Sequence, residues 1–149
     1  MAYESIVVGT DGSATAELAV RHAGKLAADN GARLVIVTAY EPQGDALLRR
    51  EEQAPEDIKW ALTDRNQAEE RARHGRSLAA EIGATKLVTQ AIEGSPADVL
   101  LEAAQDFGAD VIVVGSRGLT GTARFVLGSV ASSVSHHAPC DVLIVHTTG

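Results

Sequence analysis

Apolar, mostly β-branched residues occur in short continuous runs at positions 6–8, 34–37, 111–114 and 142–145. Runs of this length without polar interruption are typical of parallel strands that are covered on both faces. Residues 86–92, "KLVTQAI", are more mixed, which predicts a strand at an edge of the sheet. The pattern therefore predicts a strand at each of these places.

Between these runs the apolar positions recur at helical spacing. Over residues 13–30 they fall on one face, and Gly31 follows where a left-handed C-cap belongs. A further helix is predicted from Ser95, as N-cap, with Pro96 in the first turn. Its predicted buried stripe consists of Val99, Leu100, Ala103 and Phe107.

A less regular helix is expected within residues 56–82. Its apolar positions have helical spacing, but Gly75 interrupts them. The preceding residues 41–57 mix charges with proline and glycine, which favours a solvated loop. These residues give no sign of a domain linker or an internal repeat.

Strands that alternate with helices define an α/β protein. We expect one domain over residues 1–149, with a five-stranded parallel sheet, right-handed crossovers and helices on both faces. In such sheets ligands bind beyond the carboxyl ends of the strands, where the strand order reverses. The segments after the first and fourth strands are the places to search.

Composition narrows the functional classes. The chain has 149 residues, 45% of them apolar, a net charge of −7 and a single cysteine, Cys140. The negative charge opposes broad binding to nucleic acid. One cysteine forms no internal disulfide, which suits a reducing cytoplasm, and no apolar run approaches the roughly 20 residues that span a bilayer. We expect a cytoplasmic protein without a membrane or nucleic-acid partner.

The stretch "GSRGLTGTARFVLGS", residues 115–129, directly follows the apolar run 111–114. Gly115 and Gly118 permit close approach of a ligand to the backbone, and Gly128-Ser129 opens a helix. A helix N-terminus binds anions because its first N–H groups have no partner in the helix. Arg117 and Arg124 add charge-assisted bonds, so this stretch fits a phosphate.

Asp11 follows the first strand and suits ribose hydroxyls or an adenine edge better than phosphates. The same residues also fit a purely structural role. In that interpretation the glycines only form turns and caps, and Asp11 with Ser13 caps the first helix. Spacing alone leaves both interpretations open.

The spacing Gly115-x2-Gly118-x9-Gly128-Ser129 resembles the nucleotide-binding signature of the universal stress protein family. The opening "SIVVGTDGSATAELAVRHAGKLA" and the close "APCDVLIVH" are similar to the same family. The resemblance spans essentially the whole chain. It implies a Rossmann-like sheet of order 3-2-1-4-5, of the adenine nucleotide alpha-hydrolase type, with ATP bound between strands one and four.

By this resemblance, Asp11 meets the ribose or the adenine, Ala39 lines the base pocket, and the glycine stretch surrounds ribose and phosphates. The residues that it implies for nucleotide binding are Gly9, Thr10, Asp11, Ala39, Val114, Gly115, Arg117, Gly118, Gly128, Ser129 and Val130. It also implies a regulatory role in a stress response and a homodimer. We expect the dimer to form through the exposed edge of strand five, residues 142–145.

One residue departs from the family pattern. ATP-binding relatives often carry a hydroxyl two residues after the motif serine, where this chain has Ala131. A phosphate contact is then missing, which favours a shorter phosphate tail. The chain also resembles small actinobacterial members of the family, some of which bind cyclic AMP. The ligand stays open between ATP, with Mg²⁺ as its companion ion, and cyclic AMP.

Other functional classes fit less well. A flavodoxin-like electron carrier has a phosphate loop that residues 10–15 resemble, but the chain has few aromatic residues to hold a flavin. The motifs of receiver domains, P-loop enzymes and GxGxxG dehydrogenases are missing.

His136 and His137, adjacent on a helix, do not face one metal. We expect no catalytic residue and no metal site; slow ATP hydrolysis or self-phosphorylation at Ser129 is implied only by the resemblance. A relative that binds no nucleotide and acts through protein contacts is the remaining alternative.

Overall fold

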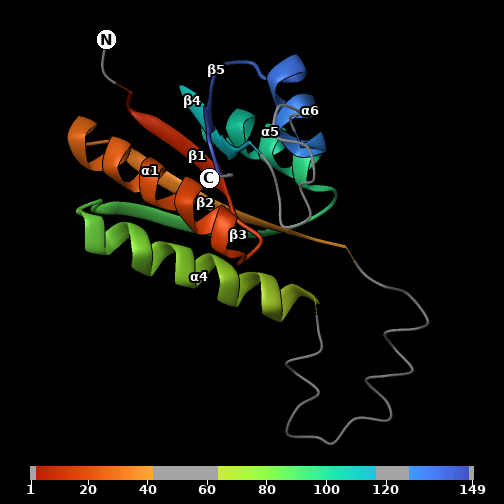
Figure 1. The fold of residues 1–149 in the computed structure, drawn as a ribbon, viewed down its shortest axis with the longest axis horizontal. Coiled ribbons are helices and arrows are strands. Elements are labelled where there is room, and N and C mark those ends of the chain that lie inside the picture. The colour runs from red at the N-terminus through yellow and green to blue at the C-terminus, as the bar shows by residue number, and fades with distance from the viewer. Residues whose placement is uncertain (1–2, 42–63, 117–127, 148–149) are drawn as a thin grey trace, which may run out of the picture.

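The computed structural model describes residues 3–41, 64–116 and 128–147 of the chain. It contains a five-stranded parallel sheet of order β3-β2-β1-β4-β5, which confirms the expected fold class (Figure 1). The strands are β1 (Ser5–Gly9), β2 (Arg33–Tyr40), β3 (Lys86–Glu93), β4 (Val111–Gly115) and β5 (Asp141–Val145). The helices are α1 (Ala14–Asn30), α4 (Asp64–Ile82), α5 (Pro96–Asp106) and α6 (Ser129–His137).

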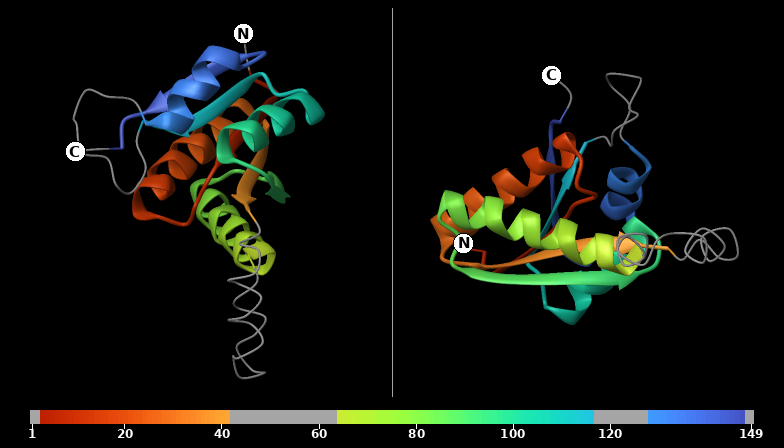
Figure 2. Two further views of the ribbon diagram at one scale, coloured as in Figure 1. Left: turned by 90° about the vertical axis from the view of Figure 1, so that its right-hand side faces the viewer. Right: turned by 90° about the horizontal axis from the view of Figure 1, so that it is seen from below.

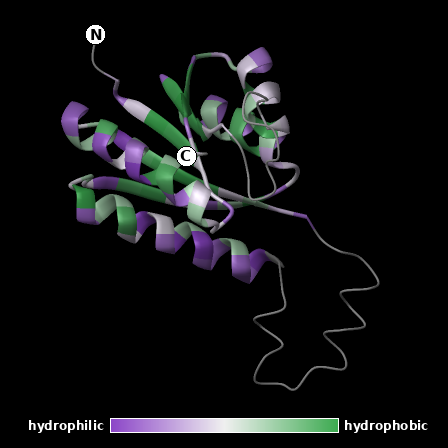
Figure 3. Cartoon of the chain, in the orientation of Figure 1, coloured by the Kyte–Doolittle hydropathy of each residue, from purple (hydrophilic) through white to green (hydrophobic). Residues whose placement is uncertain are grey.

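Of the helices in the described residues, two lie on each face of the sheet. α1 and α4 run side by side against one face, whereas α5 and α6 pack on the other (Figure 2). Successive strand residues alternate between the two layers, so Ile6 and Val8 contact the α1 side while Val7 contacts the α5 side. Burial on both faces explains why the central strands are continuous apolar runs, seen as green ribbon in Figure 3.

The two outer strands are less buried than the central ones. β3 is half-buried along most of its length, in agreement with its mixed sequence and its predicted place at an edge. β5 forms the opposite edge, and Leu143 is exposed there. Within the described ranges, none of the helices is long and apolar enough to span a membrane.

The ends of α1 are those that the sequence predicts. The hydroxyl of Ser13 accepts the N–H of Ala16 at 3.1 Å, and Gly31 adopts φ +64° at the C-cap. The start of α5 differs in one respect. Ser95 has the extended backbone of an N-cap, but its side chain makes no capping bond, so Pro96 and the backbone alone begin this helix.

Gly75 does not interrupt its helix; that interpretation of the sequence is wrong. α4 runs continuously through Gly75, which is buried, and a Cβ there would lie 3.0 Å from Cγ2 of Ile36. Gly24 has the same function in α1, since its Cβ would lie 3.1 Å from Cα of Ala79. The two glycines let α4 approach both the sheet and α1 closely. The remainder of the predicted range, residues 56–63, lies outside the described residues.

A larger side chain at this crossing should loosen the layer of α1 and α4. We expect Gly24→Val to lower the free energy of unfolding by about 1–3 kcal/mol, because the nearest atom is backbone and cannot move aside. Lys25→Val, on the exposed side of the same helix, is the control and should cost less than about 1 kcal/mol. Urea denaturation measures both, and equal losses would contradict the packing described.

Candidate functional site

A cavity of about 170 Å³ opens at the carboxyl ends of β1 and β4. β1 pairs with β2 on one side and with β4 on the other, so the strand order reverses at this point. The chain leaves the sheet there in opposite directions, which makes this the expected ligand position in an open parallel sheet. The lining residues are Gly9, Thr10, Asp11, Ser13, Thr15, Ala16, Val37, Ala39, Pro96, Val99, Leu100, Val114, Gly115 and Val130.

Most of the residues predicted from the sequence gather at this cavity. Those that line it are Gly9, Thr10, Asp11, Ala39, Val114, Gly115 and Val130. Gly128 and Ser129 do not line it, although Ser129 directly precedes Val130 in the first turn of α6. Arg117, Gly118 and Arg124 lie outside the described residues.

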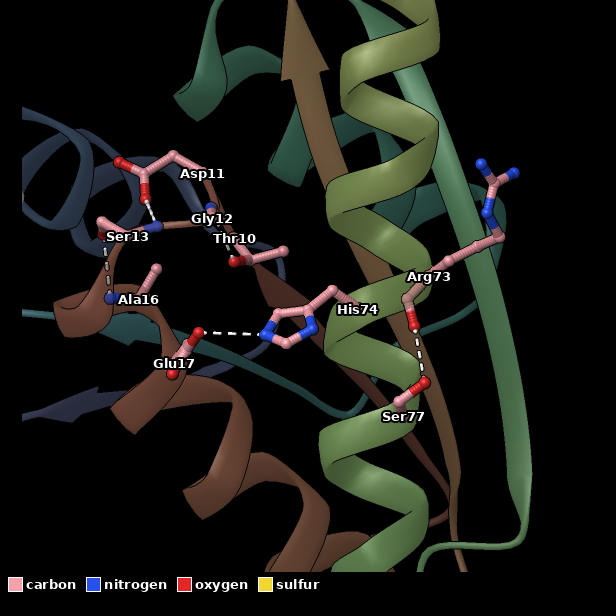
Figure 4. Close-up of polar contacts among 9 residues, drawn as sticks. All are labelled: Thr10, Asp11, Gly12, Ser13, Ala16, Glu17, Arg73, His74 and Ser77. Carbon is pink, nitrogen blue, oxygen red and sulfur yellow. Dashed lines mark hydrogen bonds and ion pairs between the residues drawn. The ribbon is translucent and has the colours of Figure 1, made fainter.

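The loop between β1 and α1 is held by its own side chains (Figure 4). The hydroxyl of Thr10 accepts the N–H of Gly12 at 3.1 Å, and Oδ1 of Asp11 accepts the N–H of Ser13 at 2.9 Å. Gly12 has φ +83°, a conformation that side chains rarely adopt. The carboxylate of Asp11 remains exposed at the cavity, so it has a structural contact and is also accessible to a ligand.

A contact outside the cavity joins the two helices of this layer. Nε2 of His74 on α4 lies 3.0 Å from Oε1 of Glu17 in the first turn of α1 (Figure 4). Both side chains are solvent-accessible, so the pair stabilises the crossing only modestly. It helps to fix where α1 begins relative to α4.

The start of α6 differs from the start of α1. Gly128 is extended at the N-cap and offers no side chain, while its N–H donates to the carbonyl of Ser116 at 2.8 Å. No side chain of the described residues caps the next N–H groups of α6, whereas at α1 the hydroxyl of Ser13 accepts one such N–H. Of these two helix starts, α6 is the one better able to bind an anion.

The cavity has an apolar wall whose residues were not among the site residues predicted from the sequence. Val37 comes from β2, and Pro96, Val99 and Leu100 come from the first turns of α5. The sequence did mark Val99 and Leu100 as a buried stripe, but only the crossover from β3 to α5 brings them over β1 and β2. The other lining residues that were missed are Ser13, Thr15 and Ala16 at the start of α1.

Ala131 is buried in the core and not at the cavity. Only 1% of its surface is exposed, and it packs with Val134 in the layer formed by α5 and α6. The preceding residue, Val130, lines the cavity instead. The missing hydroxyl at position 131 therefore does not change the cavity lining described here.

Metal-binding side chains do not cluster within the residues that the structure describes: no three of the His, Cys, Asp and Glu side chains come together there. Nδ1 of His136 lies 2.7 Å from the carbonyl of Ser132, and Nδ1 of His137 lies 2.9 Å from that of Ser133. Each imidazole is thus bonded to its own helix. Among the described residues that line the cavity, Asp11 is the one carboxylate.

A five-stranded parallel sheet with a cavity at its switch point places the protein among Rossmann-like α/β proteins. Comparison with known families is more specific: the model of the Universal stress protein family matches residues 2–146. The chain belongs to this family.

Individual relatives agree with this assignment. Universal stress protein Rv1636 of Mycobacterium tuberculosis (strain ATCC 25618 / H37Rv) is 38% identical over 147 residues, covering 99% of each chain. A crystal structure of a universal stress protein in complex with cAMP is 36% identical with a TM-score of 0.73, covering 99% of this chain and 100% of that one. The universal stress protein from Archaeoglobus fulgidus in complex with dAMP is 25% identical with a TM-score of 0.68, covering 97% and 98%.

The cap of α1 is a testable part of this site. We expect Ser13→Ala to lower the free energy of unfolding by about 1 kcal/mol, because the N–H of Ala16 loses its acceptor. Ser77→Ala on α4 is the control, since the exposed Ser77 hydroxyl only donates to the carbonyl of Arg73 (Figure 4). Its effect should stay within about 0.5 kcal/mol. Denaturant unfolding that shows no difference between the two variants would contradict the capping role.

Proposed function

We propose that the chain binds an adenine nucleotide in the cavity between β1 and β4 and has a regulatory role. The observation that carries this proposal is the convergence of the glycine-rich end of β4, Asp11 and an apolar wall on one cavity at the switch point. The cAMP and dAMP complexes of its relatives support the same ligand class. A pocket with an apolar lining and a few polar groups is also the usual form of a small-molecule site.

The two ends of the cavity suit different parts of a nucleotide. Val37, Ala39 and Leu100 offer an apolar surface for the base, and the exposed carboxylate of Asp11 suits hydroxyl donors of the ribose. Gly115 and the start of α6 suit the phosphate, because free N–H groups and the helix dipole favour an anion. We assign Gly9, Thr10 and Val114 to the floor of the site, and Arg117, Gly118, Gly128 and Ser129 to the phosphate end.

ATP and cyclic AMP both fit this division of the site. A single cyclic phosphate needs no more than the start of α6, while the longer tail of ATP also draws on Arg117 and Gly118. The described lining does not form a magnesium site of its own, because Asp11 is its one carboxylate and Oδ1 already accepts the N–H of Ser13. Mg²⁺ would therefore enter bound to the phosphates of ATP.

We propose further that two chains associate through β5. This strand is an edge of the sheet, and its Leu143 is 40% exposed, which is a liability for an isolated chain. Pairing of two β5 edges about a two-fold axis would cover Leu143 and the free backbone groups together. The partner in this proposal is a second copy of the same chain.

Nucleotide binding can be tested by calorimetric titration with ATP and with cyclic AMP, each with and without Mg²⁺. We expect the wild-type chain to bind at least one of them, and Ala39→Leu to weaken binding about tenfold or more, because the larger side chain occupies the apolar wall. Ala91→Leu is the matched control: Ala91 is also half-buried, but on β3 and outside the cavity lining. Absence of binding at millimolar concentration would favour a protein that acts through protein contacts alone.

Dimerisation has its own test. We expect Leu143→Arg to convert the dimer into a monomer, because two guanidinium groups would meet at the edge of β5. Leu18→Arg on α1 is the control, since Leu18 is similarly exposed, at 43%, but belongs to a helix and not to the edge strand. Light scattering coupled to size exclusion measures both variants. A wild-type chain that is monomeric at micromolar concentration contradicts the proposal.

A further inference from the structure

Ser116 is a buried serine whose polar atoms are all engaged. It directly follows β4, and 8% of its surface is exposed. Its N–H donates to the carbonyl of Val145 at 2.7 Å, and its carbonyl accepts the N–H of Gly128 at 2.8 Å. Its hydroxyl accepts the N–H of Thr147 at 3.1 Å and shares a second hydrogen bond with Oγ1 of Thr147 at 3.3 Å. One residue thus joins the ends of β4 and β5 to the start of α6.

These bonds relate two parts of the cavity wall. Gly115, next to Ser116, and Val130, two residues after Gly128, both line the cavity but come from separate elements. The bond between Ser116 and Gly128 sets the position of the start of α6 relative to the end of β4. The phosphate end of the cavity depends on that position.

The hydroxyl of Ser116 does not take part in the hydrogen-bond ladder of the sheet. The ladder between β4 and β5 needs only backbone groups, yet the hydroxyl lies buried against Thr147, which is 6% exposed. A buried hydroxyl is tolerated only when it is hydrogen-bonded, so loss of either partner destabilises the contact. The pair therefore ties residue 147, which follows β5, to the start of the glycine-rich stretch.

We propose that Ser116 is a positioning residue for nucleotide binding and that the Ser116–Thr147 pair couples the cavity to the segment after β5. This inference rests on the proposed nucleotide site. A ligand between Gly115 and the start of α6 stabilises the arrangement that Ser116 holds, and so it also stabilises the contact with Thr147. Because such coupling is reciprocal, loss of the contact with Thr147 weakens ligand binding by the same free energy by which the ligand stabilises that contact.

Titration with ATP and cyclic AMP tests the positioning role. We expect Ser116→Ala to weaken the binding of the ligand that wild type prefers by about tenfold, since one buried acceptor is lost. Thr147→Val keeps the backbone N–H bond to Ser116 and removes only the hydroxyl, so its effect should be smaller. Ser135→Ala on α6 is the control, because the exposed Ser135 hydroxyl donates to the carbonyl of Ser132 within its own helix.

Hydrogen exchange separates this coupling from a general loss of structure. We expect the ligand to slow hydrogen exchange of the backbone amide at position 147 in wild type, Thr147→Val and Ser135→Ala. It should not do so in Ser116→Ala, whose side chain no longer accepts that N–H. If Ser116→Ala does not fold, the inference is tested by the ligand affinity of Thr147→Val and by the exchange of the Thr147 amide in wild type. Wild-type binding with unchanged exchange at Thr147, or with full affinity in Ser116→Ala and Thr147→Val, overturns the inference and leaves the nucleotide site standing. No binding by wild type overturns both.

Discussion

The structure depends on the pairing of β1 with two neighbours, β2 and β4. Ile6, Val7 and Val8 are completely buried, since they have strands on both sides and helices on both faces. From β1 the chain continues to β2 and β3 on one side of the sheet, whereas β4 and β5 lie on the other side of β1. The cavity lies where these directions diverge. The position of the cavity follows from the order of the strands. The side chains that line the cavity then determine which ligand it suits.

Short polar contacts hold the described segments beside this cavity in place. Thr10, Asp11 and Ser13 accept N–H groups between the end of β1 and the first turn of α1, and Ser116, directly after β4, accepts the N–H of Thr147 after β5. The loop after β1 thus has a defined shape before any ligand arrives. Preformed loops reduce the entropy that a ligand must lose on binding. The start of α6 has no such side chain of its own, which leaves its N–H groups for an anion.

The apolar pattern was sufficient to locate the central strands, because burial on both faces of a strand produces a continuous apolar run, whereas the strand order was implied by the family resemblance. The sequence was also sufficient for Gly31, where the C-cap demands a positive φ. It was misleading at Gly75, because a glycine that breaks a helix and one that permits close packing look alike until the neighbouring Ile36 is placed. Ala131 was overvalued for a similar reason: the motif gives its distance along the chain, but only the orientation of α6 shows that it faces the core. Leu100 was recognised as buried, yet its place in the cavity wall depends on the crossover from β3 to β4.

The proposed nucleotide site is the cavity at the switch point of the sheet. Backbone amide chemical shifts, recorded while cyclic AMP or ATP is added, test it residue by residue. We expect the largest shifts at Gly9, Gly115 and Val130, with little change at Lys86 at the opposite end of the sheet. Shifts centred on the amino ends of the strands, or no shifts at saturating nucleotide, would contradict it.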